Sequence, residues 1–201
     1  MTKTMLSLSE RYAELDERYL HPLVILENEE HRQLVHRLRD ESAKWLAGRG
    51  IDQYSTGPHS KSARGHEGID RLFDAGQFVG WDVAGRIVSV AAITEPDPDF
   101  WTPEEMAEPQ AYLTHFHVAE HGKHHGLHLL FAIRGNERRI GSRWLRLDCW
   151  RTNTKLHDYY LRFGFERVRT EVVPGRMSGE LFQYDLRERS TSPNDDGWVR
   201  I

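Results

Sequence analysis

The sequence lacks the marks of several protein classes. Its one cysteine, Cys149, cannot form a disulfide within the chain, which is typical of a protein from a reducing compartment. No apolar run approaches the ~20 residues of a membrane-spanning helix, and residues 1–20 lack the apolar centre of a signal peptide. A formal net charge of −4 and a pI near 6.3 give no general excess of positive charge. We therefore expect a cytoplasmic protein whose partners are neither nucleic acid nor membranes.

The chain has enough apolar material for one domain. Of its 201 residues 38% are hydrophobic, and six Trp and eight Phe supply much of the apolar area. Residues 1–20 carry apolar side chains at helical spacing, which predicts an amphipathic N-terminal extension that packs on the domain or on a second subunit. Residues 21–187 are expected to form the domain, and the polar residues 188–201 predict a flexible tail.

The hydrophobic pattern predicts strands and helices in alternation within the domain. Asn28 is a good N-cap for a helix that ends near Ala47, before two glycines. Residues 51–67 are polar and predict a long functional loop or lid, followed by a short helix at 68–76. The other predicted elements are a hairpin at 78–93, a helix start at 102–105, strands at 111–120, 143–150, 165–173 and 180–187, and helices after the first two of these strands. This order predicts an α/β (α+β) fold, with a mixed central β-sheet flanked by helices on both faces.

Residues 121–128 (HGKHHGLH) connect a predicted strand to the start of a helix. A glycine-containing turn of this kind presents backbone N–H groups at the positive end of the helix dipole. Anions, phosphates above all, bind at such a place. The segment therefore predicts a phosphate site.

The same segment resembles the acyl-CoA loop of the GNAT family of N-acetyltransferases. The family pattern V-x-P-x-x-R-G-x-G-[IL]-G is matched by Val118, Gly126 and Leu127, with Lys123 where the family has Arg or Gln. The sequence departs from the pattern at Glu120, His124 and His128.

A second GNAT motif follows the strand at 143–150. The family pattern N-x-x-[AL]-x-x-x-Y-x-x-x-G-F is matched at every spacing by Asn153, Leu156, Tyr160, Gly164 and Phe165. Together the two motifs give a resemblance that covers about residues 22–187, and they imply the mixed-sheet acyltransferase fold.

The resemblance implies acetyl-CoA as cosubstrate. The backbone near residues 117–119 would bind the pantetheine arm, and an N–H near Val118 would polarise the thioester carbonyl. Tyr160 is expected to protonate the leaving thiolate, with Tyr159 as its competitor. The implied cofactor-binding residues are His117, Val118, Ala119, Lys123, His124, His125, Gly126, Leu127, His128, Asn153 and Tyr160.

The sequence defines the acceptor side less closely. A free alkyl amine, with a pKa of about 10, is mostly protonated at neutral pH and needs a base before it can attack. The candidate bases are Glu120, His115, His117 and the acids at 95–99. Of these, Glu120 is the expected catalytic residue. Trp101 beside acidic residues, together with His115, is expected to contact a cationic substrate. Burial of Trp101 in the core is the alternative.

Six of the twelve histidines lie between His115 and His128. No carboxylate or cysteine pattern completes a metal site around them, so we expect phosphate contacts and no metal. The expected activity is acetylation of the primary amine of a small molecule. The alternatives are a catalytically weakened acyl-CoA binder or sensor, and an enzyme that acts on a protein or peptide amine. The resemblance also implies a homodimer as one expected state, because dimers are common in this family.

Overall fold

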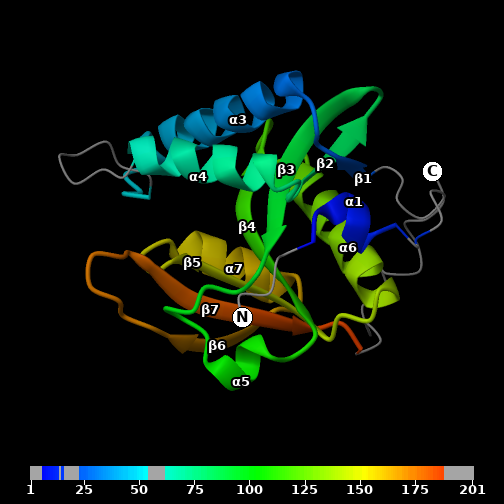
Figure 1. Ribbon diagram of the computed structural model, residues 1–201. Coiled ribbons are helices and arrows are strands. Elements are labelled where there is room, and N and C mark those ends of the chain that lie inside the picture. Colours follow the sequence, from blue (N-terminus) through cyan, green and yellow to red (C-terminus); the bar gives the residue numbers. More distant parts are fainter. Residues whose placement is uncertain (1–5, 14, 16–22, 54–61, 188–201) are drawn as a thin grey trace.

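The computed structural model describes residues 6–13, 15, 23–53 and 62–187. Its centre is a seven-stranded sheet in the order β1-β2-β3-β4-β5-β7-β6 (Figure 1). Neighbouring strands are antiparallel, except for the parallel pair β4–β5. The strands are β1 (Leu23–Ile25), β2 (Phe78–Val83), β3 (Arg86–Thr94), β4 (Gln110–Val118), β5 (Trp144–Trp150), β6 (Glu166–Thr170) and β7 (Ser178–Asp185). The predicted mixed sheet is confirmed.

Helices cover both faces of this sheet (Figure 1). They are α1 (Leu8–Arg11), α3 (Glu29–Ala47), α4 (Ser62–Asp74), α5 (Pro103–Met106), α6 (His125–Arg139) and α7 (Thr154–Arg162). Apolar residues of α6 and α7 share one core with strand residues such as Val79 and Leu147. Those of α3 and α4 pack with Phe78 and Val90, which alternation along the strands places on the opposite face. A third, smaller cluster on this second face holds Trp101.

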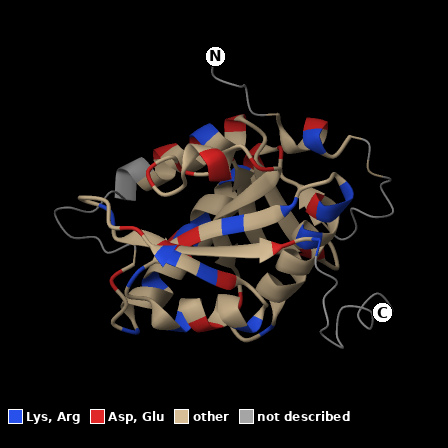
Figure 2. Ribbon diagram, turned by 90° about the horizontal axis from the view of Figure 1, so that it is seen from below, with Lys and Arg blue, Asp and Glu red and all other residues tan. Residues whose placement is uncertain are grey.

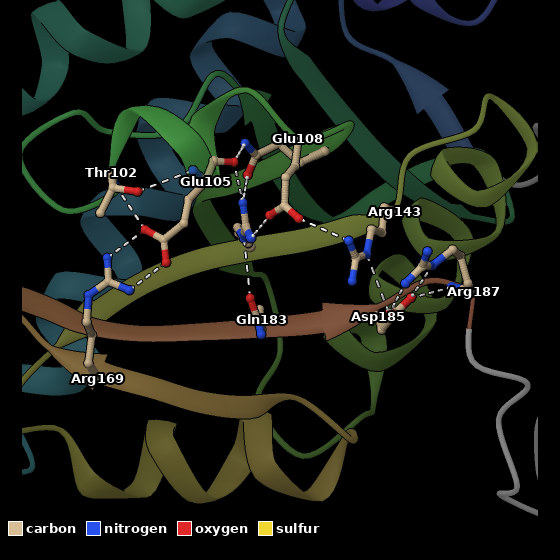
Figure 3. A network of polar contacts seen from close by, with 10 residues as sticks. Thr102, Glu105, Glu108, Arg143, Arg169, Gln183, Asp185 and Arg187 are labelled. Carbon is tan, nitrogen blue, oxygen red and sulfur yellow. Dashed lines mark hydrogen bonds and ion pairs between the residues drawn. The ribbon is translucent and has the colours of Figure 1, made fainter.

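Local sequence explains where several helices begin. The side chain of Asn28 accepts a hydrogen bond from His31 N and caps α3, as predicted. The short helix α5 starts in a capping box between Thr102 and Glu105. In Figure 3 Glu105 also meets the guanidinium of Arg169 on β6, and this contact ties α5 to the sheet.

Two predictions about the elements need correction. The helix expected at 68–76 starts six residues earlier, at Ser62, so the loop after α3 is shorter than predicted. Of the predicted N-terminal helix, the described part contains only α1, and residues 1–5, 14 and 16–20 lie outside the described residues. Leu8 and Tyr12 are buried in the main core, so this part of the N-terminal segment packs on its own domain.

Charged residues of both signs are distributed over the whole domain. In the view of Figure 2 acidic and basic positions are interspersed along helices and strands. This distribution agrees with the small net charge of −4.

Candidate active site

The parallel strands β4 and β5 pair over only part of their length. Their register begins at Gln110↔Trp144 and ends at Leu113↔Leu147. Beyond that point β4 continues to Val118 beside β3, and β5 continues to Trp150 beside β7. The two strands therefore separate into a fork, and we use this name for the place where residues 114–118 and 148–150 diverge.

The backbone of β4 turns hydrogen-bonding groups toward this fork. A bulge interrupts the β3–β4 register, and within it His115 has a left-handed φ of 48°. After the bulge, Ala119 N donates to Val88 O on the β3 side. Because the direction of N–H and C=O groups alternates along a strand, the groups of Val118 point the other way, into the fork. The Ala119 N–H is engaged with β3, and the neighbouring Val118 N–H is the one aimed at the fork.

The N-terminus of α6 lies beside β4. Its N-cap, His124, has a left-handed φ of 60°, and in the described part of the chain no side chain caps the first N–H groups. The hydroxyl of Ser89 on β3 donates to His125 O and fixes the first turn to the sheet. Gly126 is buried there, and a β-carbon on it would lie 2.9 Å from Tyr159 Oη and 3.0 Å from Phe116 Cζ. Glycine therefore lets α6, α7 and β4 meet closely at this point.

Two of the loop histidines stack on aromatic rings. His121 lies on Trp45 of α3, with ring centroids 3.7 Å apart, and His128 lies near Trp81 of β2 at 5.4 Å. Burial lowers the pKa of both imidazoles below the usual histidine value. Lys123 is exposed, and Leu127 is partly buried.

His115 and His117 point away from the fork. His117 is buried under α3, with Nδ1 3.3 Å from Ser42 Oγ, and His115 lies against Phe78. Burial lowers the pKa of His115 to about 4 and that of His117 to about 3, so both rings are neutral at physiological pH. The His117 ring is enclosed between the sheet and α3, so a contact of this residue with the cofactor would involve its backbone, and its cofactor role stays a prediction.

Glu120, the catalytic base expected from the sequence, does not lie in an enclosed position. It is exposed and pairs with Arg86 of β3 at 3.2 Å. This contact draws its carboxylate to the β3 side of β4, away from β5. A catalytic role for Glu120 stays a prediction without support from its position.

The second motif lies where β5 passes into α7. Asn153 caps α7 by accepting from Leu156 N, and its amide nitrogen donates to Gln53 Oε1 at 2.9 Å. Tyr160 is 5% exposed, with its ring against Phe165 and Phe182. Both residues thus have structural partners, and their cofactor roles remain predictions. The neighbouring residue, Tyr159, places its hydroxyl at the first turn of α6, beside Gly126.

Trp101 does not present an open aromatic face. It is 2% exposed, and the guanidinium groups of Arg146 and Arg169 lie over its ring at 4.7 and 5.5 Å. The exposed ring expected for a cationic substrate is therefore a wrong prediction, and the alternative of a core tryptophan holds. Its cation–π partners come from the protein itself.

The segment after α3 crosses from one branch of the fork to the other. Trp45 near the end of α3 stacks on the loop after β4. Seven residues later, Asp52 accepts hydrogen bonds from Trp150 Nε1 (2.7 Å) and Thr152 Oγ1 (2.9 Å) at the end of β5. Residues 48–53 thus link the diverging ends of β4 and β5.

Sequence reasoning missed Asp148. It is the first residue of β5 beyond the fork point, it is partly buried, and its carboxylate accepts a hydrogen bond from the Tyr112 hydroxyl. Burial raises the pKa of Asp148, while hydrogen bonds from Tyr112 and Ser178 oppose the rise. A lone aspartate inside the apolar strand WLRLDCW was the available signal.

The described residues contain neither a metal-binding cluster nor a membrane-spanning helix. No group of three or more histidine, cysteine, aspartate or glutamate side chains there is arranged to hold a metal ion. No helix in the same ranges has the length and apolarity to cross a membrane.

Comparison with known proteins points to one fold. No family model and no curated protein matches the chain. Among solved structures, it is similar to a GNAT-family acetyltransferase from Streptococcus agalactiae (13% identity, TM-score 0.63), with 84% of this chain and 98% of the other covered. A GNAT-family acetyltransferase from Listeria monocytogenes matches at 19% identity and TM-score 0.61 over 81% of this chain and 93% of its own. The yncA protein from Salmonella typhimurium, solved with its cofactor acetyl-CoA, matches at 12% identity and TM-score 0.54 over 84% and 95%. The chain therefore has the GNAT acetyltransferase fold.

Proposed function

We propose that this chain, which has the GNAT acetyltransferase fold, transfers the acetyl group of acetyl-CoA to the primary amine of a small molecule. One observation carries the proposal. The fork between β4 and β5 exposes strand backbone beside the N-terminus of α6, which no side chain among the described residues caps. An extended amide-containing arm and an anionic head group are the two parts of a ligand that such a pair of features suits.

The pantetheine arm of acetyl-CoA would lie along β4 as an added strand. Its amides would bond the backbone groups that β4 directs into the fork, those of Val118 among them. The pyrophosphate would meet the N–H groups at the start of α6, where Lys123 adds a point charge. The solved yncA protein, which has this fold and holds acetyl-CoA, supports the assignment.

The chemistry is direct attack of a neutral amine on the thioester carbon. Negative charge then develops on the carbonyl oxygen, and an N–H in the fork, that of Val118, would stabilise it. The thiolate of CoA leaves and takes up a proton. Tyr160 is the proposed donor, and Tyr159 is its competitor because its hydroxyl lies at α6.

The test is release of free thiol from acetyl-CoA in the presence of amines. Butylamine, 1,4-diaminobutane, tyramine and a peptide with a free N-terminus form a suitable panel. We expect a small amine to raise thiol release well above hydrolysis. Acetyl-CoA alone should also raise the melting temperature, since a ligand at 100 times its Kd stabilises the folded state by about 2.7 kcal/mol.

The result separates the alternatives. Stabilisation by acetyl-CoA without thiol release would favour the acyl-CoA binder or sensor. Turnover restricted to the peptide would shift the acceptor class to protein termini. If acetyl-CoA neither stabilises the protein nor releases thiol with any amine, the proposal is refuted.

A further inference from the structure

We infer that Asp148 is the catalytic base, which binds the ammonium group of the acceptor and takes its proton before attack. The inference rests on the proposed acetyl transfer. It assigns this step to a residue that the sequence motifs do not contain.

The position of Asp148 at the fork is the first argument. Pairing of β4 with β5 ends at Leu113↔Leu147, so Asp148 is the first β5 residue at the opening. Leu147 and Cys149 belong to the core under α6 and α7. Because side chains alternate along a strand, Asp148 points to the opposite face of the sheet. An acceptor entering from that face would meet this carboxylate where the strands part.

The charge balance around Asp148 is the second argument. In the described part of the chain no basic side chain lies within ion-pair distance of it. The charge of Arg176 lowers the pKa of Asp148, but its Nη1 already pairs with Asp97 at 2.7 Å and Asp99 at 3.0 Å. An ionised, partly buried carboxylate without its own cation is unfavourable in the free protein. A substrate ammonium would supply the missing charge.

Tyr112 holds Asp148 in place. Its hydroxyl donates to Asp148 Oδ1 from the neighbouring strand, on the same face of the sheet. Burial and the Asp148 charge raise the pKa of Tyr112 well above its usual value, so the phenol keeps its proton and remains a donor. We therefore place Tyr112 as a positioning residue, which orients the carboxylate of Asp148.

The other candidate bases are less suited to the step. The rings of His115 and His117 are packed beneath α3 and α4, and burial lowers their pKa values to about 4 and 3. Glu120 is exposed and paired with Arg86. Asp97 is engaged by Arg176.

The proton and the bonds balance in two steps. One N–H proton of the acceptor ammonium moves to the Asp148 carboxylate, which yields the neutral amine. The amine nitrogen forms a bond to the acetyl carbon of acetyl-CoA, and the carbon–sulfur bond breaks. The thiolate takes a proton, the amide nitrogen loses its second one, and Asp148 releases its proton to water.

The central test is the Asp148→Asn variant in the thiol-release assay. The amide keeps an oxygen that accepts from Tyr112 but cannot take a proton. We expect kcat/KM to fall by about 10²–10⁴-fold, the range of general base catalysis, while the Kd of acetyl-CoA measured by calorimetry stays unchanged. Asp185→Asn, which removes a carboxylate at the far end of β7, is the charge-matched control and should keep the wild-type kcat/KM.

The free energy of unfolding of Asp148→Asn distinguishes a catalytic from a structural aspartate, because the two roles predict changes of opposite sign. Since the folded-state pKa of Asp148 is raised, the folded protein holds this proton more tightly than the unfolded chain does. Ionisation then costs folding free energy as the pH rises through these pKa values. Asp148→Asn removes this cost, so we expect unchanged or higher stability at neutral pH. A strongly destabilised variant would point to a structural aspartate.

The pH profile tests the role of Tyr112. The charged or titratable groups that act on Asp148 are Tyr112 from β4, Asp97 from the loop after β3 and Arg176 from the β6–β7 turn. Tyr112→Phe removes a hydrogen bond to the charged form of Asp148 and should move the acidic limb of kcat/KM to higher pH. An unmoved limb would remove Tyr112 from the positioning role.

The outcomes separate this inference from the proposed function. Thiol release by Asp148→Asn at the wild-type rate, in a protein that acetylates amines, would overturn the base assignment and leave the acetyltransferase intact. Failure of the wild-type protein to bind acetyl-CoA or to release thiol with any amine would overturn both.

Discussion

Replacing Arg146 by alanine should lower the free energy of unfolding by about 3 kcal/mol, because several acceptors lose a buried donor at a cost of about 1–3 kcal/mol each. Arg146 is 2% exposed and lies at the centre of a polar network between α5 and the sheet. Its Nη2 pairs with Glu108 at 2.5 Å, and its Nη1 donates to Glu105 O at 2.6 Å and Gln110 Oε1 at 2.9 Å. The variant would leave these acceptors without their donor, and Trp101 without the cation over its ring.

Equilibrium unfolding in guanidinium chloride measures the effect. The matched control is Arg187→Ala, which removes an exposed arginine that pairs with Asp185 at the edge of the same network (Figure 3). Exposed pairs contribute little, so the control should unfold like the wild type. A similar loss of stability in both variants would show that burial of Arg146 does not decide its contribution.

The second large effect is expected for Gly179→Ala in the β6–β7 hairpin. Gly179 has a φ of 119°, and a β-carbon there would lie 2.2 Å from Glu171 O, a backbone atom. The two residues are also joined by the hydrogen bond from Glu171 N to Gly179 O at 2.8 Å. The strands would have to separate to admit a methyl group, so we expect a loss of about 3 kcal/mol or more.

Gly175→Ala is the control for the backbone term alone. Gly175 also has a positive φ, of 75°, but a β-carbon on it would meet nothing within 4 Å. Alanine there should cost about 1–2 kcal/mol, the strain of a left-handed residue. Equal losses at both glycines, by chemical or thermal unfolding, would contradict the contact with Glu171 O.

Local chemistry in the sequence predicts much of the fold. Asn28 caps α3 because a short polar side chain before an apolar-periodic run satisfies a free N–H, a rule that needs no tertiary knowledge. The sequence predicts too late a start for α4, because the buried residues of this helix, Ile69 and Phe73, lie in its second half. Its first turns have no apolar periodicity that distinguishes a helix from a polar loop.

The candidate site depends on properties that no single segment contains. The fork exists because pairing stops after Leu113↔Leu147, which depends on two strands and on the helices over them. The bulge at His115 changes which side chains of β4 face α3, so simple alternation could not show that His117 lies under Ser42. Asp148 and Tyr112 come together only through the β4–β5 pairing.

The most direct test of the acyl-CoA site is hydrogen–deuterium exchange with and without acetyl-CoA. Hydrogen exchange reports, for each segment of the chain, whether its backbone N–H groups become protected. The account predicts slower exchange in residues 114–119 of the fork and 125–128 at the start of α6, with residues 166–170 of β6 unchanged as an internal reference. Unchanged exchange at the fork and at α6, in a protein that binds acetyl-CoA, would contradict the account.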